Sequence, residues 1–211
     1  MRRSARSLFA CLAVAVSLAA APALAADSST APDAKPASPA PQAKQDQSQK
    51  TPAEERADLY ARLAASKDAD ETEGIVTLLL HSYSESGSDT GDLLLQRARH
   101  AIGIERYQDA LKILDQTIAL LPDWAEGWNA RATVRYLDDD YNGSMADVAQ
   151  TLKREPNHLG ALMGMGAILE ARGKREDALK VYERALTIAP HWRNAKEAAD
   201  KLKSALSGSE L

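Results

Sequence analysis

The sequence contains a single cysteine, Cys11, among its 211 residues. This cysteine lies in an N-terminal segment that we expect to be removed, so the mature chain would hold no thiol. Disulfide bonds and thiol chemistry are therefore excluded for the mature protein, even in an oxidising compartment. Lipidation of Cys11 is disfavoured as well, because the apolar run follows this cysteine and does not precede it.

An excess of positive charge is also absent. The chain has 26 Lys and Arg against 30 Asp and Glu, which gives a net charge of −4 at pH 7. Residues 1–25 hold three arginines and no acidic residue, so the remaining chain has 23 basic against 30 acidic residues and a net charge of −7. Proteins that bind nucleic acid through its phosphates need a basic surface. The acidic balance therefore excludes nucleic acid as the main partner.

Catalytic and metal-binding motifs are missing too. The sequence has no phosphate-binding loop, nucleophile elbow or carboxylate pair. Its four histidines have no i, i+4 partner and no cysteine ligand; they are His81, His100, His158 and His191. The acidic run 138–140 is not followed by the spaced oxygen ligands of a calcium loop, and we expect a solvated turn there. The sequence thus predicts no enzyme, no cofactor and no metal.

The N-terminus carries the features of an export signal. Arg2, Arg3 and Arg6 precede an uncharged run over residues 7–26, and Ala23-Leu24-Ala25 forms a small-residue cleavage motif. We expect residues 1–25 to be a cleaved signal peptide and the protein to be periplasmic, with no membrane insertion after cleavage. The alternative is an uncleaved anchor in the inner membrane, because an uncharged run of about 20 residues is near the minimum that spans a bilayer.

Residues 26–52 are rich in proline, alanine, serine and glutamine, and they hold no aliphatic side chain larger than alanine. Such a segment has nothing to bury that would offset the entropy lost on ordering. We expect a disordered linker there.

Three prolines recur at intervals of 34 residues: Pro122, Pro156 and Pro190. They divide the chain into the segments 91–124, 125–158 and 159–192. Small residues recur in register at Ala98, Ala132 and Gly166, at Ala110, Ser144 and Ala178, and at Thr117, Thr151 and Ala185. Large apolar residues recur at Leu94, Trp128 and Leu162, and at Leu114, Val148 and Tyr182. A fixed period of this length predicts an all-α stack of helical hairpins.

This pattern resembles the tetratricopeptide repeat (TPR) of small exported bacterial proteins, and the third segment fits it best. The matching positions there are Leu162, Met165, Gly166, Leu169, Ala178, Tyr182, Ala185 and Pro190, with Gly173 in the tight turn between two helices. The resemblance implies a right-handed α-solenoid of three clear repeats that binds a protein or peptide. Arg97, Arg131 and Arg135 depart from the family pattern, and we expect them to extend along the helix surface.

The repeats have a predicted helical neighbour at each end. Residues 53–90 contain two apolar helices, over 53–67 and 71–83, but lack the proline and small-residue pattern. We interpret them as a degenerate hairpin that caps the start of the array, since terminal repeats depart from consensus. Residues 191–211 are expected to form a C-terminal capping helix and a tail. We expect Trp124, Trp128 and Trp192 to be packing residues, and Tyr107 and Tyr141 likewise.

In the family, the concave face is lined by fixed positions of the first helix of each repeat. The resemblance therefore implies a peptide-binding groove lined by Asp92, Leu95, Arg99, Ile102, Glu126, Asn129, Thr133, Tyr136, Leu137, Met163, Ala167 and Glu170. Asn129 is suited to hydrogen-bond a peptide backbone, and Met163 offers an adaptable apolar contact. Some relatives grip a terminal carboxylate at five positions, which here are Leu95, Arg99, Ala130, Gly160 and Gly164. Only Arg99 fits, so the sequence excludes that clamp.

Together these features predict a protein–protein interaction scaffold of the bacterial periplasm that binds a peptide or protein segment, with a role in envelope assembly or maturation. The alternative is a structural spacer that self-associates and is tethered to the inner membrane by an uncleaved signal anchor. Weak homo-oligomers fit either hypothesis.

Overall fold

The computed structural model describes residues 51–208, so the predicted signal peptide and nearly all of the predicted linker lie outside the described part. The described residues form nine helices and no strand. The helices are α2 (Pro52–Ala65), α3 (Ala69–Tyr83), α4 (Asp89–Gly103), α5 (Tyr107–Leu120), α6 (Ala125–Leu137), α7 (Tyr141–Arg154), α8 (Leu159–Ala171), α9 (Arg175–Ile188) and α10 (Arg193–Ser207). None of these helices is long and apolar enough to cross a membrane.

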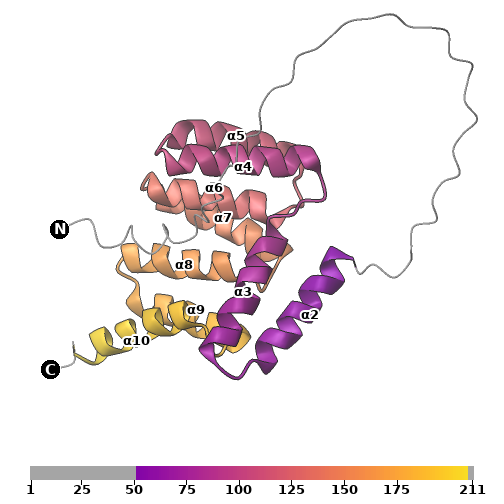
Figure 1. Cartoon of the computed structure of the whole chain (residues 1–211). Coiled ribbons are helices and arrows are strands. Elements are labelled where there is room, and N and C mark those ends of the chain that lie inside the picture. Colours follow the sequence, from indigo (N-terminus) through magenta and orange to yellow (C-terminus); the bar gives the residue numbers. More distant parts are fainter. Residues whose placement is uncertain (1–50, 209–211) are drawn as a thin grey trace, which may run out of the picture.

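Helices α4 to α9 form three antiparallel hairpins that stack on one another, and α10 packs on α9 at the end of the stack (Figure 1). Each predicted repeat supplies one hairpin, and each closing proline lies two residues beyond the end of a second helix, because proline cannot continue a helix. The predicted α-solenoid of three repeats with a C-terminal capping helix is confirmed.

The recurring small residues let the two helices of each hairpin approach closely. Ala98 and Ala110 are fully buried between α4 and α5. In the third repeat a Cβ atom at Gly166 would overlap the ring of Tyr182. In the second repeat the hydroxyl of Ser144 donates to the carbonyl of Ala132 at 2.7 Å and so links α6 to α7. The predicted close-packing positions thus have the role expected of them.

The turn between the helices of each repeat uses a left-handed backbone conformation at the same repeat position. Gly173, the predicted turn glycine, has φ +74°. Glu105 and Asp139 occupy the equivalent positions with φ 58° and 62°, where a Cβ atom is unfavourable. Next to Asp139, Asp140 accepts a hydrogen bond from the backbone N–H of Gly143 at 2.9 Å and caps α7. The acidic run therefore shapes and caps an exposed turn.

Two of the arginines that depart from the family pattern lie elsewhere than predicted. Arg131 forms a bidentate ion pair with Asp147, at 2.8 and 2.9 Å, and Arg135 contacts the same carboxylate at 3.0 Å. The side chain of Asp147 on α7 is only 3% exposed. These arginines converge on a buried carboxylate that the sequence did not single out, because nothing in the local pattern links α6 to α7. Arg97 is exposed, as predicted.

The three tryptophans pack in different ways. Trp192 is buried, as predicted, and Trp124 is partly buried against the first repeat. Trp128 is only partly buried: the guanidinium groups of Arg131 and Arg154 lie 5.0 and 4.7 Å from its ring centroid. Its indole N–H donates to the carbonyl of Pro122 at 2.9 Å. Trp128 therefore packs beneath arginines at the surface instead of filling a core between helices.

The N-terminal hairpin α2–α3 is present, but it does not cap the first repeat as predicted. Helix α3 crosses the stack instead of extending it (Figure 1). Its apolar residues Ile75, Val76, Leu79 and Tyr83 are buried in one cluster with residues of α8, α9, α10 and the turn between α9 and α10, namely Leu159, Leu162, Ala185, Ala189, Trp192 and Ala195. The hairpin thus reaches the third repeat and the capping helix.

The surface of α4 explains this placement. Helix α6 buries Ala130 and Val134 against the first repeat. At the equivalent positions α4 carries Gln96 and His100, which are exposed. A hairpin stacked on α4 would bury these polar side chains, whereas the third repeat and the start of α10 offer apolar surface. The hairpin therefore packs where its apolar face is matched.

Candidate functional site

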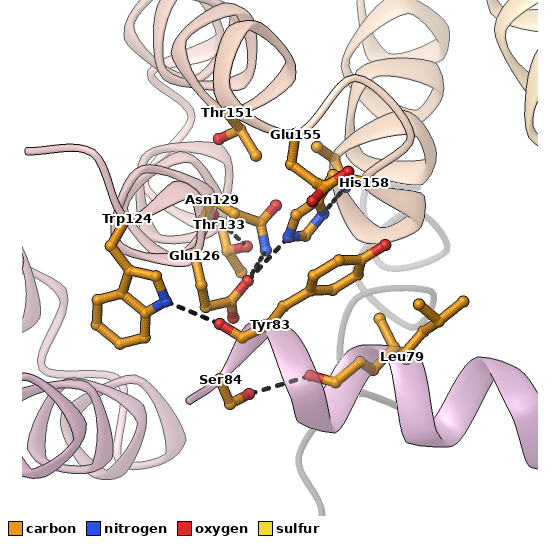
Figure 2. Close-up of polar contacts among 12 residues, drawn as sticks. Leu79, Tyr83, Ser84, Trp124, Glu126, Asn129, Thr133, Thr151, Glu155 and His158 are labelled. Atoms are coloured by element: carbon orange, nitrogen blue, oxygen red, sulfur yellow. Dashed lines mark hydrogen bonds and ion pairs between the residues drawn. The ribbon is translucent and has the colours of Figure 1, made fainter. Parts of the chain in front are cut away.

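The first helices of the three repeats, α4, α6 and α8, lie side by side and form what we call the inner face. The C-terminal end of α3 meets this face at a polar cluster, shown in Figure 2. The cluster contains Glu126 and Asn129 of α6, His158 just before α8, and Arg99 of α4. Glu126, Asn129 and His158 are buried, which is uncommon for polar side chains unless they have partners.

Glu126 is the centre of the cluster. Its carboxylate accepts hydrogen bonds from Arg99 at 2.8 Å and from the side-chain amide of Asn129 at 2.9 Å. Burial by itself raises the pKa of Glu126. The contacts with His158, the charge of Arg99 and the bond from Asn129 outweigh it and hold the pKa below its ordinary value. Glu126 is therefore a buried carboxylate that stays ionised at neutral pH.

His158 has a separate role on each ring nitrogen. Its Nδ1 accepts a hydrogen bond from the backbone N–H of Ala161 at 3.1 Å and so caps α8. Because Nδ1 is an acceptor, we assign the ring proton to Nε2, which lies 3.2 Å from the Glu126 carboxylate. That contact has hydrogen-bond length but is poorly aligned, so its contribution is mainly electrostatic. The imidazole thus caps α8 through Nδ1 and faces the Glu126 carboxylate through Nε2.

The end of α3 closes over this cluster. The ring of Tyr83 stacks on His158 with centroids 4.0 Å apart and planes 20° apart. The indole N–H of Trp124 donates to the backbone carbonyl of Tyr83 at 2.9 Å, and Arg99 donates to the hydroxyl of Ser84 at 2.8 Å. The C-terminus of a helix carries partial negative charge and unsatisfied carbonyls, so a donor and a cation are favourable there. The cluster therefore binds a helix end.

A second set of contacts holds α2 in place. The phenol oxygens of Tyr60 and Tyr83 are 2.5 Å apart, and Tyr60 also donates to the carbonyl of Asn157 at 3.0 Å. Burial raises the pKa of both phenols, so both stay protonated and able to donate. Arg56 of α2 lies 3.5 Å from Glu155. These bonds join the hairpin to the loop that precedes α8.

Trp124, His158 and Trp192 occupy one repeat position, the last residue of each 34-residue segment. We call these three residues the α3-contact row. Trp124 bonds the carbonyl at the end of α3, His158 stacks on Tyr83, and Trp192 lies in the buried cluster that holds Ile75 and Val76. At the other end of α3, Arg193 contacts Asp70 at 2.9 Å. Helix α3 thus runs along the row from the third repeat to the first.

The row matches α3 in length. Neighbouring packed helices are about 8–10 Å apart, so a row across three repeats spans about 20 Å. The stretch from Asp70 to Tyr83 has a similar length, because an α-helix rises about 1.5 Å per residue. One helix can therefore contact all three members of the row.

The structure separates the predicted groove residues into three groups. Glu126 and Asn129 are buried in the cluster beneath α3, and Arg99 is bound there with its side chain 48% exposed. Leu95 and Tyr136 are buried between helices in apolar clusters, so they face no open groove. Asp92 accepts hydrogen bonds from Ser86 and holds the chain that connects α3 to α4.

The third group is partly exposed on the inner face, with two members at the border of the covered part; its members are Ile102, Thr133, Leu137, Met163, Ala167 and Glu170. Thr133 donates to the carbonyl of Asn129 at 3.1 Å, and Met163 packs against the buried cluster under α3. Glu170 accepts from Tyr182 at 2.7 Å and pairs with Lys201 at 3.6 Å. The prediction of one continuous groove is therefore corrected to a covered part and an open part.

Sequence reasoning missed His158, Tyr83 and Trp124 as interacting residues. A signal for His158 is present in the repeat register. At this repeat position the first and third repeats carry tryptophan, Trp124 and Trp192, and the second carries His158. A polar residue in place of two tryptophans indicates a contact with something other than the next repeat. Among the described residues, no group of three or more His, Cys, Asp or Glu side chains could hold a metal.

Comparison with known proteins gives two sequence relatives, although no protein-family model matches the chain. The chain is 39% identical over 165 residues to a TPR repeat-containing protein of Rhizobium etli, covering 78% of this chain and 81% of that protein. It is 25% identical over 128 residues to small glutamine-rich tetratricopeptide repeat-containing protein 2 of Saccharomyces cerevisiae, covering 61% of this chain and 37% of that protein.

Solved structures are similar in fold. The first TPR of Spaghetti (RPAP3), bound to the HSP90 peptide SRMEEVD, has a TM-score of 0.54 at 21% identity and covers 57% of this chain and 95% of that chain. The crystal structure of MamA protein has a TM-score of 0.51 at 15% identity and covers 73% of this chain and 84% of that chain. At these identities the likeness concerns the fold alone.

Proposed function

Because the chain belongs to the tetratricopeptide-repeat family, we propose that it is an exported, periplasmic scaffold that binds a peptide or protein segment on its inner face. The TPR fold is that of a protein–protein interaction scaffold. The location, the peptide ligand and a role in envelope assembly or maturation are the proposed parts. The N-terminal arginines, the uncharged run and the Ala-Leu-Ala motif support export.

One observation supports the inner face as the binding surface. A segment of the chain itself, α3, lies against this face and is held by ring stacking, by an indole N–H and by apolar contacts. These are the contacts by which helical segments are recognised in grooves. The face therefore has the chemistry to hold a segment from another protein, and its open part supplies Ile102, Ala167 and Glu170.

A scaffold fits the polar cluster better than a catalyst does. A carboxylate beside an imidazole is a common catalytic pair, but here His158 is 0% exposed and covered by Tyr83. Its Nδ1 is used as a helix cap. A general base must reach the proton of a substrate, which this ring does not do in the described conformation. We therefore propose a binding role and no catalytic one.

Site-specific photo-crosslinking in the native cell tests the proposed surface. A photoreactive residue replaces Ile102 or Glu170 on the inner face, and Gln116 on α5 serves as the matched control because it is exposed on a second helix. We expect the same crosslinked partner from both inner-face positions and none from the control. Equal crosslinking at all three positions would contradict the inner face as the binding surface.

The proposed export has its own test. After osmotic shock, the protein should appear in the periplasmic fraction, and sequencing of its N-terminus should begin at Ala26. A chain that keeps Met1 and sediments with the inner membrane would instead support the tethered spacer.

One observation favours self-association as a second function. Leu93 is 45% exposed and Ile104 is 50% exposed on the side of the first repeat that no hairpin covers. Apolar side chains at an open solenoid end are suited to stack on another copy. Sedimentation velocity should then show a dimer that Leu93→Lys abolishes, whereas a monomer at high concentration would remove this function.

A further inference from the structure

The polar and apolar contacts along the α3-contact row form one continuous binding surface for a helix. We propose that this surface recognises an amphipathic helix of a partner protein, and that the α2–α3 hairpin is its displaceable internal occupant. This inference rests on the proposed scaffold function and deepens it by naming the class of partner. The occupant that the surface now holds, α3, indicates the chemistry of the partner helix.

One end of the binding surface is apolar. Trp192, Leu159 and Leu162 bury Ile75, Val76 and Leu79 in one cluster. These three residues of α3 stand at i, i+1 and i+4, which places them on one side of a helix. The partner helix therefore needs large aliphatic side chains at these three positions.

The other end of the binding surface contacts the C-terminal end of α3. Tyr83, at i+8, stacks on His158, and its backbone carbonyl accepts from Trp124. Arg99 adds a cation at the same place, 2.8 Å from the hydroxyl of Ser84. The surface therefore recognises a helix that carries an aromatic ring at i+8 and that ends there, with a backbone carbonyl facing Trp124 and a hydroxyl acceptor facing Arg99.

The repeats have apolar clusters to which the hairpin contributes no residue. Three of the buried apolar clusters contain no residue of α2 or α3, and together they cover all three repeats and α10. Of the α2 helix, only Leu63 is buried. Local regions with few buried apolar contacts open at lower free energy than the core, which describes α2 but not α3, whose apolar residues a competing helix must replace. The hairpin can therefore leave while the three repeats keep their own core.

The free-energy cost of releasing the hairpin depends in part on buried polar groups. Glu126, Asn129 and His158 are buried beneath the end of α3, and opening returns them to water. Hydration of these polar groups offsets part of the apolar contact that is lost. The connecting chain, residues 84–88, is polar, and its contacts with α4 are the hydrogen bonds of Ser86 with Asp92 and of Ser84 with Arg99. A partner helix with the same pattern then competes with α3, and its apparent affinity scales with the fraction of open protein.

The test uses the full chain and a fluorescent synthetic peptide of residues 69–88, whose binding is followed by anisotropy. Tyr83→Ala removes the stacking ring from the occupant and leaves the row intact. We expect this variant to bind the peptide at least tenfold more tightly than the unmodified chain does. Leu78→Ala is the matched control, because Leu78 lies on the same helix but is 47% exposed, and it should bind as the unmodified chain does.

A second variant opens the hairpin without touching the buried cluster. Asp70→Lys replaces the exposed ion pair with Arg193 by repulsion between two cations. Tighter peptide binding by about threefold is expected. A peptide with Leu79→Asp and Tyr83→Ala should not bind to any of the proteins.

The inference is overturned if Tyr83→Ala keeps the helical content of the unmodified chain and yet binds the peptide no more tightly. It is also overturned if the altered peptide binds equally well. The crosslinks at Ile102 and Glu170 probe the open part of the inner face, whereas the peptide probes the α3-contact row. A failure of the proposed function and a failure of this inference are therefore distinguishable.

Discussion

Tyr83 stacks on His158 with ring centroids 4.0 Å apart, and this contact joins the end of α3 to the second repeat. His158 also caps α8 and faces the buried carboxylate of Glu126, so one imidazole links three elements. Tyr83 in turn bonds Tyr60 of α2 and, through its carbonyl, Trp124. The pair therefore connects the N-terminal hairpin to the first and second repeats.

The first prediction is that Tyr83 and His158 are energetically coupled. Stacked ring pairs contribute about 0.5–1.5 kcal/mol beyond the area they bury. A double-mutant cycle with Tyr83→Ala and His158→Ala, measured by urea unfolding, should give a coupling free energy in that range. A cycle between Tyr83→Ala and Leu120→Ala, whose side chain is 51% exposed on α5, is the control and should be additive. Additive effects for the first pair would show that the stacking does not stabilise the protein.

The second prediction concerns pH and Glu126. The pKa of this carboxyl in the folded protein lies below its ordinary value of 4.5. Its charge therefore stabilises the fold above about pH 4.5, and this contribution is lost as the pH falls through the folded-state pKa. Glu126→Gln should lower the free energy of unfolding at pH 7 by about 1–3 kcal/mol, because the buried imidazole and Arg99 lose their charged partner.

The pH dependence separates this effect from a packing defect. The difference between Glu126→Gln and the unmodified chain should shrink as urea unfolding is repeated from pH 7 toward pH 3. Glu105→Gln, at an exposed turn position, is the control, and its free energy of unfolding should follow that of the unmodified chain at every pH. A difference that stays constant with pH would mean that the charge of Glu126 does not stabilise the fold.

The third prediction concerns the buried carboxylate between α6 and α7. Asp147→Ala leaves Arg131 and Arg135 without their shared partner and should destabilise the protein by about 3 kcal/mol. The side chain of Asp115, the second partner of Arg131, is 60% exposed. Asp115→Ala should therefore lower the free energy of unfolding by less than about 1 kcal/mol. Thermal unfolding followed by circular dichroism compares the two. Similar losses for both variants would contradict a special role for Asp147.

The fourth prediction concerns the repeat turns. Glu105 has φ 58° and is exposed, so Glu105→Gly should raise the free energy of unfolding by up to about 1 kcal/mol by removing backbone strain. Gly173→Ala, with φ +74°, should lower it by about 1 kcal/mol. Both are measured by urea unfolding. The two substitutions should change the free energy of unfolding in opposite directions. A loss of stability in Glu105→Gly would contradict backbone strain at Glu105.

The fifth prediction concerns the closest approach of two helices. A Cβ atom at Gly166 overlaps the ring of Tyr182, so Gly166→Ala should destabilise the third repeat by about 1–3 kcal/mol. Tyr182→Leu in the same chain removes the overlapping ring atoms and should restore part of the loss. Gly103→Ala is the control, because no atom lies within 4 Å of a Cβ built there. No rescue by Tyr182→Leu would mean that the loss has another cause.

The repeat array follows from local features of the sequence. The 34-residue spacing of Pro122, Pro156 and Pro190 defined the hairpins, and the small residues in register identified where helices touch. These features are local, since each repeat packs mainly on its neighbours and every contact recurs with the period. For the same reason Gly173 was recognisable as a turn residue.

The positions of the non-repeating parts depend on contacts between elements that are distant in the sequence. Asp147 gathers Arg131 and Arg135 through a contact that the other two repeats do not share. The position of α3 depends on Tyr83 meeting His158, two residues that share no spacing and lie far apart in the chain. Apolar periodicity shows that a helix has a face to bury, but it does not show which surface is free to receive it. That choice came from polar side chains on α4 and from the tryptophan and histidine row on the other repeats, which a three-dimensional structure alone brings together.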